Sequence, residues 1–396
     1  MKFGFFAMPL HLPTENPVLS LDRDLEMIQW AEDMDYDEFY VGEHHTASWE
    51  PIPCPEIFLA KASAFTKTIK LGTAVISAPI HHPFLLAERF AFLDQLTRGR
   101  VIMGVGPCGL PSDVRMFNLP PSELRGRMQE SLEIMVKLLE SPEPISFKGK
   151  YWDIKDMAIQ LRSYQKPRLK IALATSGSRG SLELAGRYGA ILFSPLSAGG
   201  GVGGHGRLAL KDHFGVAKAS SEKFGQQFEK EDWRVVTYVY LADNSQQAQK
   251  DVMEGIERDW KDYFWVINGG VLPDWAKGKD PSKITAKLIT EKFRWVVGTP
   301  DEAIEQIEKI NEEAGGMGGL MLTTHEWIPP DKQKRSMELF ARYVMPHFKG
   351  HTSDLKREWK RTQDLSSGGE LPFLLGSDLS SDYPMGGSKS NLSPEK

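Results

Sequence analysis

Cysteine, net charge and long apolar runs are all scarce in this sequence of 396 residues. Its only cysteines, Cys54 and Cys108, are too few for a disulfide framework, which predicts a reducing compartment, the cytoplasm. The 48 basic and 53 acidic residues leave a net charge of −5, so the charge indicates neither a nucleic-acid nor a membrane partner. No apolar run approaches the roughly 18 residues of a membrane-spanning helix. These absences leave the class of globular proteins.

Short apolar runs alternate with amphipathic stretches along most of the chain. Each run is nearly continuous, which is typical of parallel strands buried on both faces. The predicted strands are Lys2–Met8, Phe39–Gly42, Lys70–Ile76, Arg100–Gly106, Lys170–Ala174, Ala190–Ser194, Arg234–Leu241 and Gly319–Leu322. Amphipathic patterns between them predict helices over Leu21–Met34, Cys54–Thr66, Leu85–Leu96, Leu124–Glu140, Arg179–Arg187, Leu208–Phe224 and Pro300–Ala314.

Eight strands that alternate with helices indicate an α/β fold with a parallel sheet. Closure into a (β/α)8 TIM barrel is the prediction, because it leaves no edge strand, and an open doubly wound sheet is the alternative. Residues 1–348 would form this barrel.

Two segments depart from the alternation. More than fifty residues separate the seventh strand from the helix at Pro300, which predicts an insertion at about 255–295. It contains Asn268–Lys283, whose glycine pair and Trp275 suggest a closing lid; permanent packing on the barrel or at a subunit interface is the alternative. Residues 349–396 are polar and rich in Ser, Gly and Pro, which predicts a loosely ordered tail.

The run Gly104–Gly109 fits the G-x-G-x-x-G pattern of dinucleotide-binding loops. Such a loop must lead straight into a helix, and here prolines follow and no helical pattern begins before Ser122. We therefore interpret the run as a glycine-rich loop at the carboxyl end of the fourth barrel strand, where active sites form.

Histidine pairs follow two strands: His44 and His45 after the second, His81 and His82 after the third. They could serve as zinc ligands, as a proton-transfer group or as ordinary polar residues. Adjacent histidines point apart on a strand, and zinc needs three or four convergent ligands. The pattern favours a role without metal for His44, since histidine titrates near neutral pH.

A run of small and hydroxylic residues after the fifth strand opens a helix and ends at Arg179. Backbone N–H groups, the helix N-terminus and a guanidinium together suit a phosphate, although an ordinary capped loop has the same composition. Arg125 and Arg127, at the start of another helix, could supply a second cation or lie on the surface.

Several of these segments together resemble the bacterial-luciferase-like flavin monooxygenases. The resemblance covers residues 1–348 and, within the family, is strongest to the limonene monooxygenase group. It is carried, in this order, by KFGFF, GEHH (42–45), LGTAVIS (71–77), HHPFLLAE, LDQLTRGRVIMGVG (93–106) and VGTPDEAIEQI.

The resemblance implies roles for individual residues. His44 matches the family's catalytic histidine and His45 its neighbour, while Ala74 and Val75 match a cis peptide beneath the flavin ring. The other residues implied to bind the cofactor are Gly106, Arg125, Ala174, Thr175, Ser176, Gly177 and Arg179. The reactive cysteine of the luciferases aligns near Gly106, so Cys108 is displaced and light emission is not implied.

The resemblance also implies a reaction. Family members take reduced FMN, or alternatively FAD, from a separate NAD(P)H-dependent flavin reductase. They use O2 to form a flavin C4a-hydroperoxide, which oxygenates a small, mostly apolar substrate such as a terpene. A cytoplasmic homodimer is expected. The alternatives are a deazaflavin-dependent oxidoreductase and a non-catalytic flavin-binding barrel.

Overall fold

The computed structural model describes residues 1–8, 10–196, 207–267, 275–276, 278–280 and 283–368. The chain divides into two compact units, Met1–Lys349 and Gly350–Lys396.

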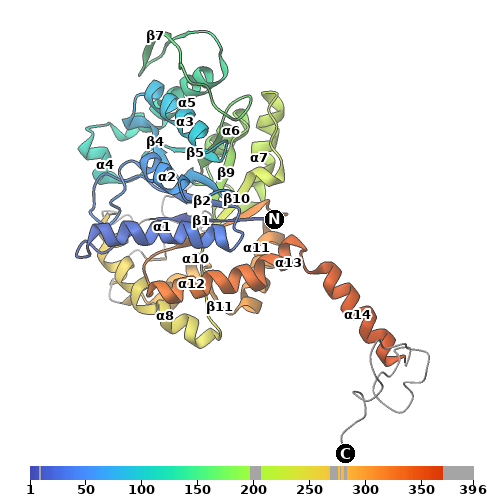
Figure 1. Cartoon of the computed structure of the whole chain (residues 1–396). Coiled ribbons are helices and arrows are strands. Elements are labelled where there is room, and N and C mark those ends of the chain that lie inside the picture. The colour runs from blue at the N-terminus through green and yellow to red at the C-terminus, as the bar shows by residue number, and fades with distance from the viewer. Residues whose placement is uncertain (9, 197–206, 268–274, 277, 281–282, 369–396) are drawn as a thin grey trace, which may run out of the picture. The chain divides into compact units, whose positions relative to one another are not determined.

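Within the described residues of the first unit, eight parallel strands close into a barrel (Figure 1). They are β1 (Lys2–Ala7), β2 (Glu38–Val41), β3 (Lys70–Thr73), β5 (Val101–Gly106), β8 (Lys170–Ala174), β9 (Ile191–Pro195), β10 (Trp233–Leu241) and β12 (Gly319–Thr324). Neighbours pair in chain order, and the β9–β10 and β12–β1 pairings complete the closure. This confirms the predicted (β/α)8 barrel.

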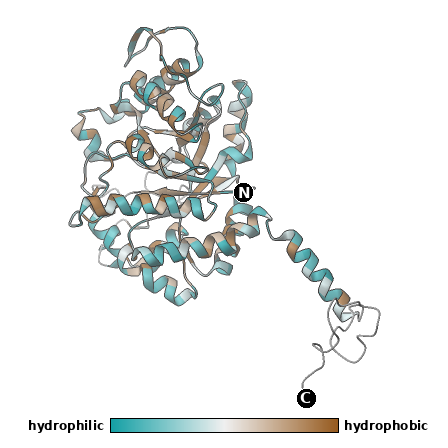
Figure 2. Ribbon diagram, in the orientation of Figure 1, coloured by the Kyte–Doolittle hydropathy of each residue, from teal (hydrophilic) through white to brown (hydrophobic). Residues whose placement is uncertain are grey.

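One helix follows each barrel strand and covers the outside of the barrel. These helices are α1 (Pro17–Asp33), α2 (Pro55–Ser63), α3 (Pro83–Leu96), α5 (Leu124–Glu140), α6 (Arg179–Arg187), α7 (Leu210–Lys223), α11 (Pro300–Glu313) and α12 (Pro330–Leu339). Figure 2 shows hydrophobic colour concentrated on the strands, whereas the helices also carry hydrophilic residues. At α11, Thr299 and Glu302 form a capping box behind Pro300.

Side chains alternate between the two faces of each strand, and those on the inner face fill the barrel interior. A cluster of buried side chains that includes Tyr40, Phe193 and Met321 packs inside it. Below it, the buried Glu38 carboxylate accepts hydrogen bonds from Arg234 at 2.8 and 3.0 Å. The opposite faces of the strands pack under the helices in the main core.

Further elements interrupt the alternation of barrel strands and helices. Short strand β4 (Ile76–Ser77) and helix α4 (Pro111–Met116) lie at the carboxyl ends of the strands, and β6 (Ile145–Lys148) pairs antiparallel with β7 (Asp153–Met157). The prediction of no helix before Ser122 was wrong, because Pro111 occupies the first turn of α4, a position that proline favours.

The insertion after β10 confirms the prediction of extra structure at this point. It contains α8 (Ser245–Arg258), the π-helix η5 (Asp259–Phe264), α9 (Trp265–Ile267), α10 (Ala286–Phe293) and β11 (Val296–Gly298), which pairs with β10. The predicted lid segment lies largely outside the described residues. Of its described residues, Trp275 stacks on Trp260 with ring centroids 5.5 Å apart and contacts Phe293. This tryptophan therefore packs within the insertion.

The barrel unit ends with π-helical residues Phe340–Val344 and α13 (Met345–Lys349). The second unit contains α14 (Ser353–Ser367), none of whose residues is buried within it. The described helices include none long and apolar enough to cross a membrane.

Candidate active site

His44 lies at the carboxyl end of β2 with carboxylates at both ring nitrogens. Its Nδ1 is 2.9 Å from Asp113 Oδ2, and its Nε2 is 3.4 Å from Glu50 Oε2. Burial alone would lower the pKa of His44, but the Asp113 hydrogen bond and the charges of Glu50, Asp113 and Glu43 outweigh it, so the pKa is raised. A histidine held in this way is suited to hold or move a proton near pH 7.

Asp113 fixes the loop that carries His44. Its Oδ1 accepts hydrogen bonds from the backbone N–H of His45 at 3.2 Å and from the Thr46 hydroxyl. Burial opposes its charge, yet these bonds and the His44 ring lower the pKa of Asp113. Asp113 was absent from the predicted site residues. The sequence signal that could have located it is the helix start at Pro111, since α4 positions this carboxylate.

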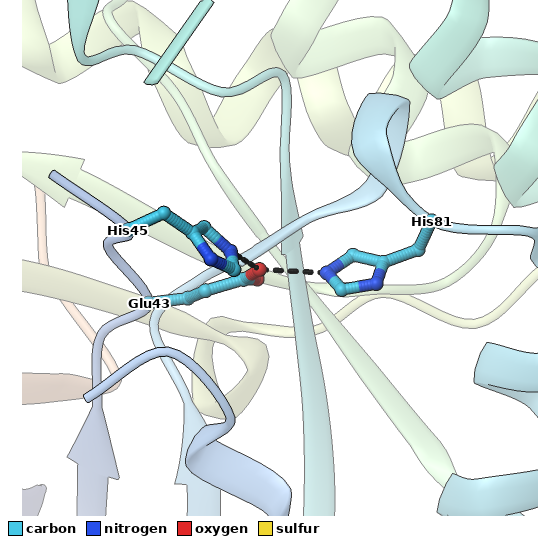
Figure 3. A group of neighbouring side chains, drawn as sticks. All are labelled: Glu43, His45 and His81. Atoms are coloured by element: carbon cyan, nitrogen blue, oxygen red, sulfur yellow. Dashed lines mark hydrogen bonds and ion pairs between the residues drawn. The ribbon is translucent and has the colours of Figure 1, made fainter. Parts of the chain in front are cut away.

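His45 belongs to a second cluster beside the first (Figure 3). Glu43 Oε1 contacts His45 Nε2 at 2.7 Å and His81 Nε2 at 2.6 Å, while Glu43 Oε2 accepts the Ser77 N–H. The hydrogen bond to Glu43 raises the pKa of His45. Each of the three side chains offers one atom that could ligate a metal, and these atoms lie within 4.8 Å of one another. Their separations of 2.6–2.7 Å are those of hydrogen bonds, so we interpret the cluster as a network that orients the two rings.

A cavity of about 290 Å³ opens in front of His44. Its lining combines polar residues His44, Glu43 and Glu50 with apolar ones, among them Phe6, Leu110 and Ile267. Ala74 and Val75 also line it, and the peptide bond between them is cis, as expected. The cavity thus joins the carboxyl ends of several barrel strands, which is where active sites form in this fold.

Two glycines of β5 permit this arrangement. A Cβ at Gly104 would lie 1.7 Å from the Thr73 carbonyl oxygen, and a Cβ at Gly106 would lie 2.3 Å from Val75 Cγ2. The Thr73 hydroxyl also donates to the Gly104 carbonyl at 2.8 Å. The G-x-G run therefore makes room for the Thr73 backbone at Gly104 and for the Val75 side chain at Gly106. This supports the interpretation of the run as something other than a nucleotide fingerprint.

Comparison with known proteins identifies the family. A model of the luciferase-like monooxygenases matches residues 1–317. The chain belongs to the luciferase-like monooxygenase family. It is 37% identical to 4-hydroxyprotoasukamycin monooxygenase of Streptomyces nodosus subsp. asukaensis, over 88% of this chain and 93% of that protein. It is 32% identical to limonene 1,2-monooxygenase of Rhodococcus erythropolis, over 92% of this chain and 91% of that protein.

A solved structure of a related monooxygenase is also similar. It is a type II Baeyer–Villiger monooxygenase, the oxygenating constituent of 3,6-diketocamphane monooxygenase from Pseudomonas putida, in complex with FMN. The TM-score is 0.74 at 27% identity, with 87% of this chain and 98% of that chain covered. These matches confirm the predicted family, the barrel and the monooxygenase class.

In this luciferase-like monooxygenase, the predicted phosphate loop lies between β8 and α6. Gly177 N–H donates to the Thr175 hydroxyl at 2.9 Å, and Thr175 is also 2.5 Å from the Ser181 hydroxyl. Ser176 and Arg179 are exposed, as is Ala174. Arg179 lines a separate cavity between α6 and α7 and lies 3.8 Å from Glu183. Arg125 is exposed at the start of α5. None of these residues lines the described His44 cavity.

Cys108 is unsuited to act as a thiolate. Its residue is 4% exposed, and burial raises the pKa of its thiol to about 11. Cys108, which is displaced from the position of the reactive luciferase cysteine, is therefore an inert thiol.

Proposed function

We propose that this chain is the oxygenase of a two-component monooxygenase. It would receive reduced FMN from a separate NAD(P)H-dependent flavin reductase and transfer one atom of O2 to a small, mostly apolar substrate such as a terpene. The observation that carries the proposal is His44, held between Asp113 and Glu50 on a cavity shared with Ala74 and Val75. The relatives named as limonene and diketocamphane monooxygenases support it.

The chain offers groups that fit a flavin. Ala74 and Val75 would lie against the ring, and Gly106, beside them, leaves the space that Val75 occupies. Ser176, Arg179 and Arg125 would bind the phosphate, because their side chains are exposed and no side chain caps α6 at Ser178. Ala174, Thr175 and Gly177 would shape that loop. When bound, the reduced FMN would be the group that reacts with O2.

The protein's own part is to hold the substrate, exclude water and manage protons. Phe6, Met8, Leu110 and Ile267 give the cavity an apolar wall, which favours an apolar substrate. Asp113 is ionised and accepts from Nδ1 of His44, so Nδ1 carries a proton and Nε2 is the atom that exchanges one. His45 would assist through its bond to Glu43.

We further propose a cytoplasmic homodimer. Cys54 and Cys108 are free thiols, in keeping with a reducing compartment. Large apolar side chains, including Ile57 of α2 and Phe92 and Leu96 of α3, are at least half exposed on two helices in contact. Such a surface is typical of a subunit interface.

Rapid mixing of the purified protein with reduced FMN and oxygen tests the reaction class. We expect a transient absorbance that lasts longer than free reduced FMN takes to be oxidised. A deazaflavin-dependent oxidoreductase or a non-catalytic flavin-binding barrel would leave the oxidation of reduced FMN as fast as in buffer.

Replacement of Arg125 by Ala tests the phosphate site. We expect FMN affinity to fall at least tenfold while riboflavin affinity stays unchanged, since riboflavin has no phosphate. Arg127→Ala is the matched control, because Arg127 is already paired with Glu123 at 3.0 Å. Equal losses for FMN and riboflavin would contradict the assignment.

A further inference from the structure

Glu50 is a buried carboxyl group that the sequence motifs do not explain. It is 3% exposed and lies between Trp49 and Pro51 in the loop from β2 to α2. Its two oxygens have different surroundings. Oε1 accepts a short hydrogen bond from the Tyr263 hydroxyl, while Oε2 has no hydrogen-bond partner among the described residues and faces His44 Nε2 at 3.4 Å. An unpartnered buried oxygen of this kind is costly unless a proton lies between it and its neighbour.

We propose that Glu50 Oε2 and His44 Nε2 share one proton, and that Tyr263 of the insertion holds the carboxyl group in position for this exchange. In one form, Glu50 is a neutral acid and His44 a neutral imidazole protonated on Nδ1. In the other, the Oε2–H bond has broken and an Nε2–H bond has formed, leaving a carboxylate beside an imidazolium. The total charge is the same in both forms.

Asp113 makes the sharing possible. Because it accepts from Nδ1, that nitrogen keeps its proton and only Nε2 is available toward Glu50. Burial raises the pKa of Glu50, against the effects of His44, Tyr263 and His325, and so favours its neutral form. The ionisable groups that face Glu50 are His44 and Asp113 from the barrel loops, Tyr238 from β10, Tyr263 from η5 and His325 after β12.

The insertion contributes a residue to this exchange. Tyr263 lies in the π-helical turn η5, is 1% exposed and packs against Trp49 with ring centroids 5.6 Å apart. π-Helical turns often occur at functional sites. Glu50 acts through His44 and is therefore a positioning residue, so the inference deepens the proposed role of His44 and rests on it.

The test follows the titration of His44 in the flavin-free protein. Histidine rings labelled with ¹³C are observed by NMR, and the His44 signal is assigned by its loss in His44→Ala. In Glu50→Gln we expect the His44 midpoint to fall by about one pH unit, because a neighbouring carboxylate is lost. Tyr263→Phe should lower it by less, since the Glu50 carboxylate loses one donor.

Matched controls separate this effect from a general loss of structure. Glu56→Gln changes another buried glutamate, which faces Arg89 at 3.4 Å, and Tyr36→Phe changes another buried tyrosine, which donates to the Met337 carbonyl at 3.0 Å. Both should leave the His44 midpoint unchanged. An unchanged midpoint in Glu50→Gln overturns the proposal, whatever the outcome of the rapid-mixing experiment with FMN.

A second measurement covers the case in which Glu50→Gln does not fold. In the unsubstituted protein, a shared proton makes the His44 signal titrate in two steps, because the protons belong to the pair. A single step at the ordinary midpoint of histidine overturns the proposal.

Discussion

At the scale of residues, the site consists of histidine rings held by buried carboxylates. Glu43 orients His45 and His81, and Asp113 orients His44. Each carboxylate also accepts a backbone N–H, from Ser77 and His45 respectively, so the loops after β2 and β3 are fixed with the rings. An arrangement with so many donors at two carboxylates preorganises the rings before any ligand binds.

His44→Ala should lower turnover about a hundredfold or more, the usual effect of losing an acid–base group, while FMN still binds. Steady-state rates and an FMN titration measure the two effects. The proposed reaction uses no metal, so treatment with a chelator should leave the unsubstituted enzyme active. Activity lost to the chelator and restored by zinc would instead assign a metal to the Glu43 cluster.

Asp113→Asn should destabilise the protein in a manner that depends on pH. The pKa of His44 is raised in the folded state, so the protonated ring stabilises the folded protein. This stabilisation is fully present below the unfolded-state pKa, near 6.5, and is lost as the pH rises through the folded-state pKa. We expect the variant to lose about 2 kcal/mol of unfolding free energy at pH 6, the scale of a charged hydrogen bond, and less at pH 9.

Urea denaturation at the two pH values measures this difference. Asp22→Asn is a suitable control, because the Asp22 side chain is 54% exposed and lies 3.4 Å from Lys61. Equal losses at pH 6 and pH 9 would show that the charge of His44 does not contribute to the pair.

At the scale of elements, the approach of β3 to β5 shapes the floor of the cavity. Lys70–Ile76 was predicted as one strand, but the structure has β3, then the Ala74–Val75 peptide, then β4. The break lies where Thr73 exchanges two hydrogen bonds with Gly104. Glycine at 104 is therefore required by the Thr73 backbone, and glycine at 106 by the Val75 side chain.

Gly104→Ala should destabilise the fold by about 3 kcal/mol or more, because the new methyl group would overlap the Thr73 carbonyl oxygen. Gly215→Ala is the control: Gly215 is exposed inside α7 and a Cβ there has no neighbour within 4 Å. That change should stabilise the protein by about 0.5–1 kcal/mol. Thermal unfolding of both variants measures the contrast, and equal effects would contradict the packing argument.

At the scale of the whole molecule, the barrel brings distant segments to one mouth. Tyr263 and Glu50 are 213 positions apart, and His44 and Asp113 are 69 apart. The insertion thus contributes to the wall of the cavity as well as packing on its own aromatic cluster around Trp260 and Trp275.

Association into dimers should depend on the apolar surface of α2 and α3. Ile57→Glu combined with Phe92→Glu should give monomers in sedimentation, because both side chains are more than half exposed and charge opposes their burial. Val18→Glu with Leu19→Glu on α1 changes two equally exposed residues and should leave the dimer intact. A monomeric parent protein would contradict the proposed homodimer, and monomers from the control alone would place the interface elsewhere.

The sequence by itself determined the barrel and its helices. Buried parallel strands appear in a sequence as apolar runs, so Lys170–Ala174 was predicted as observed, and the amphipathic pattern over Pro300–Ala314 located α11. Local chemistry also pointed to His44, since it follows a strand and belongs to a motif. Each of these features depends on residues that are close together in the chain.

Only the tertiary structure revealed what surrounds His44. Asp113, Glu50 and Tyr263 come from a short helix, a loop and a π-helical turn, none of which carries a periodic pattern strong enough to predict. A carboxylate becomes part of a site through burial and through the partner it faces, and both arise only when the strands close into a barrel. The pKa shifts of these groups therefore follow from contacts between distant residues, which no local pattern encodes.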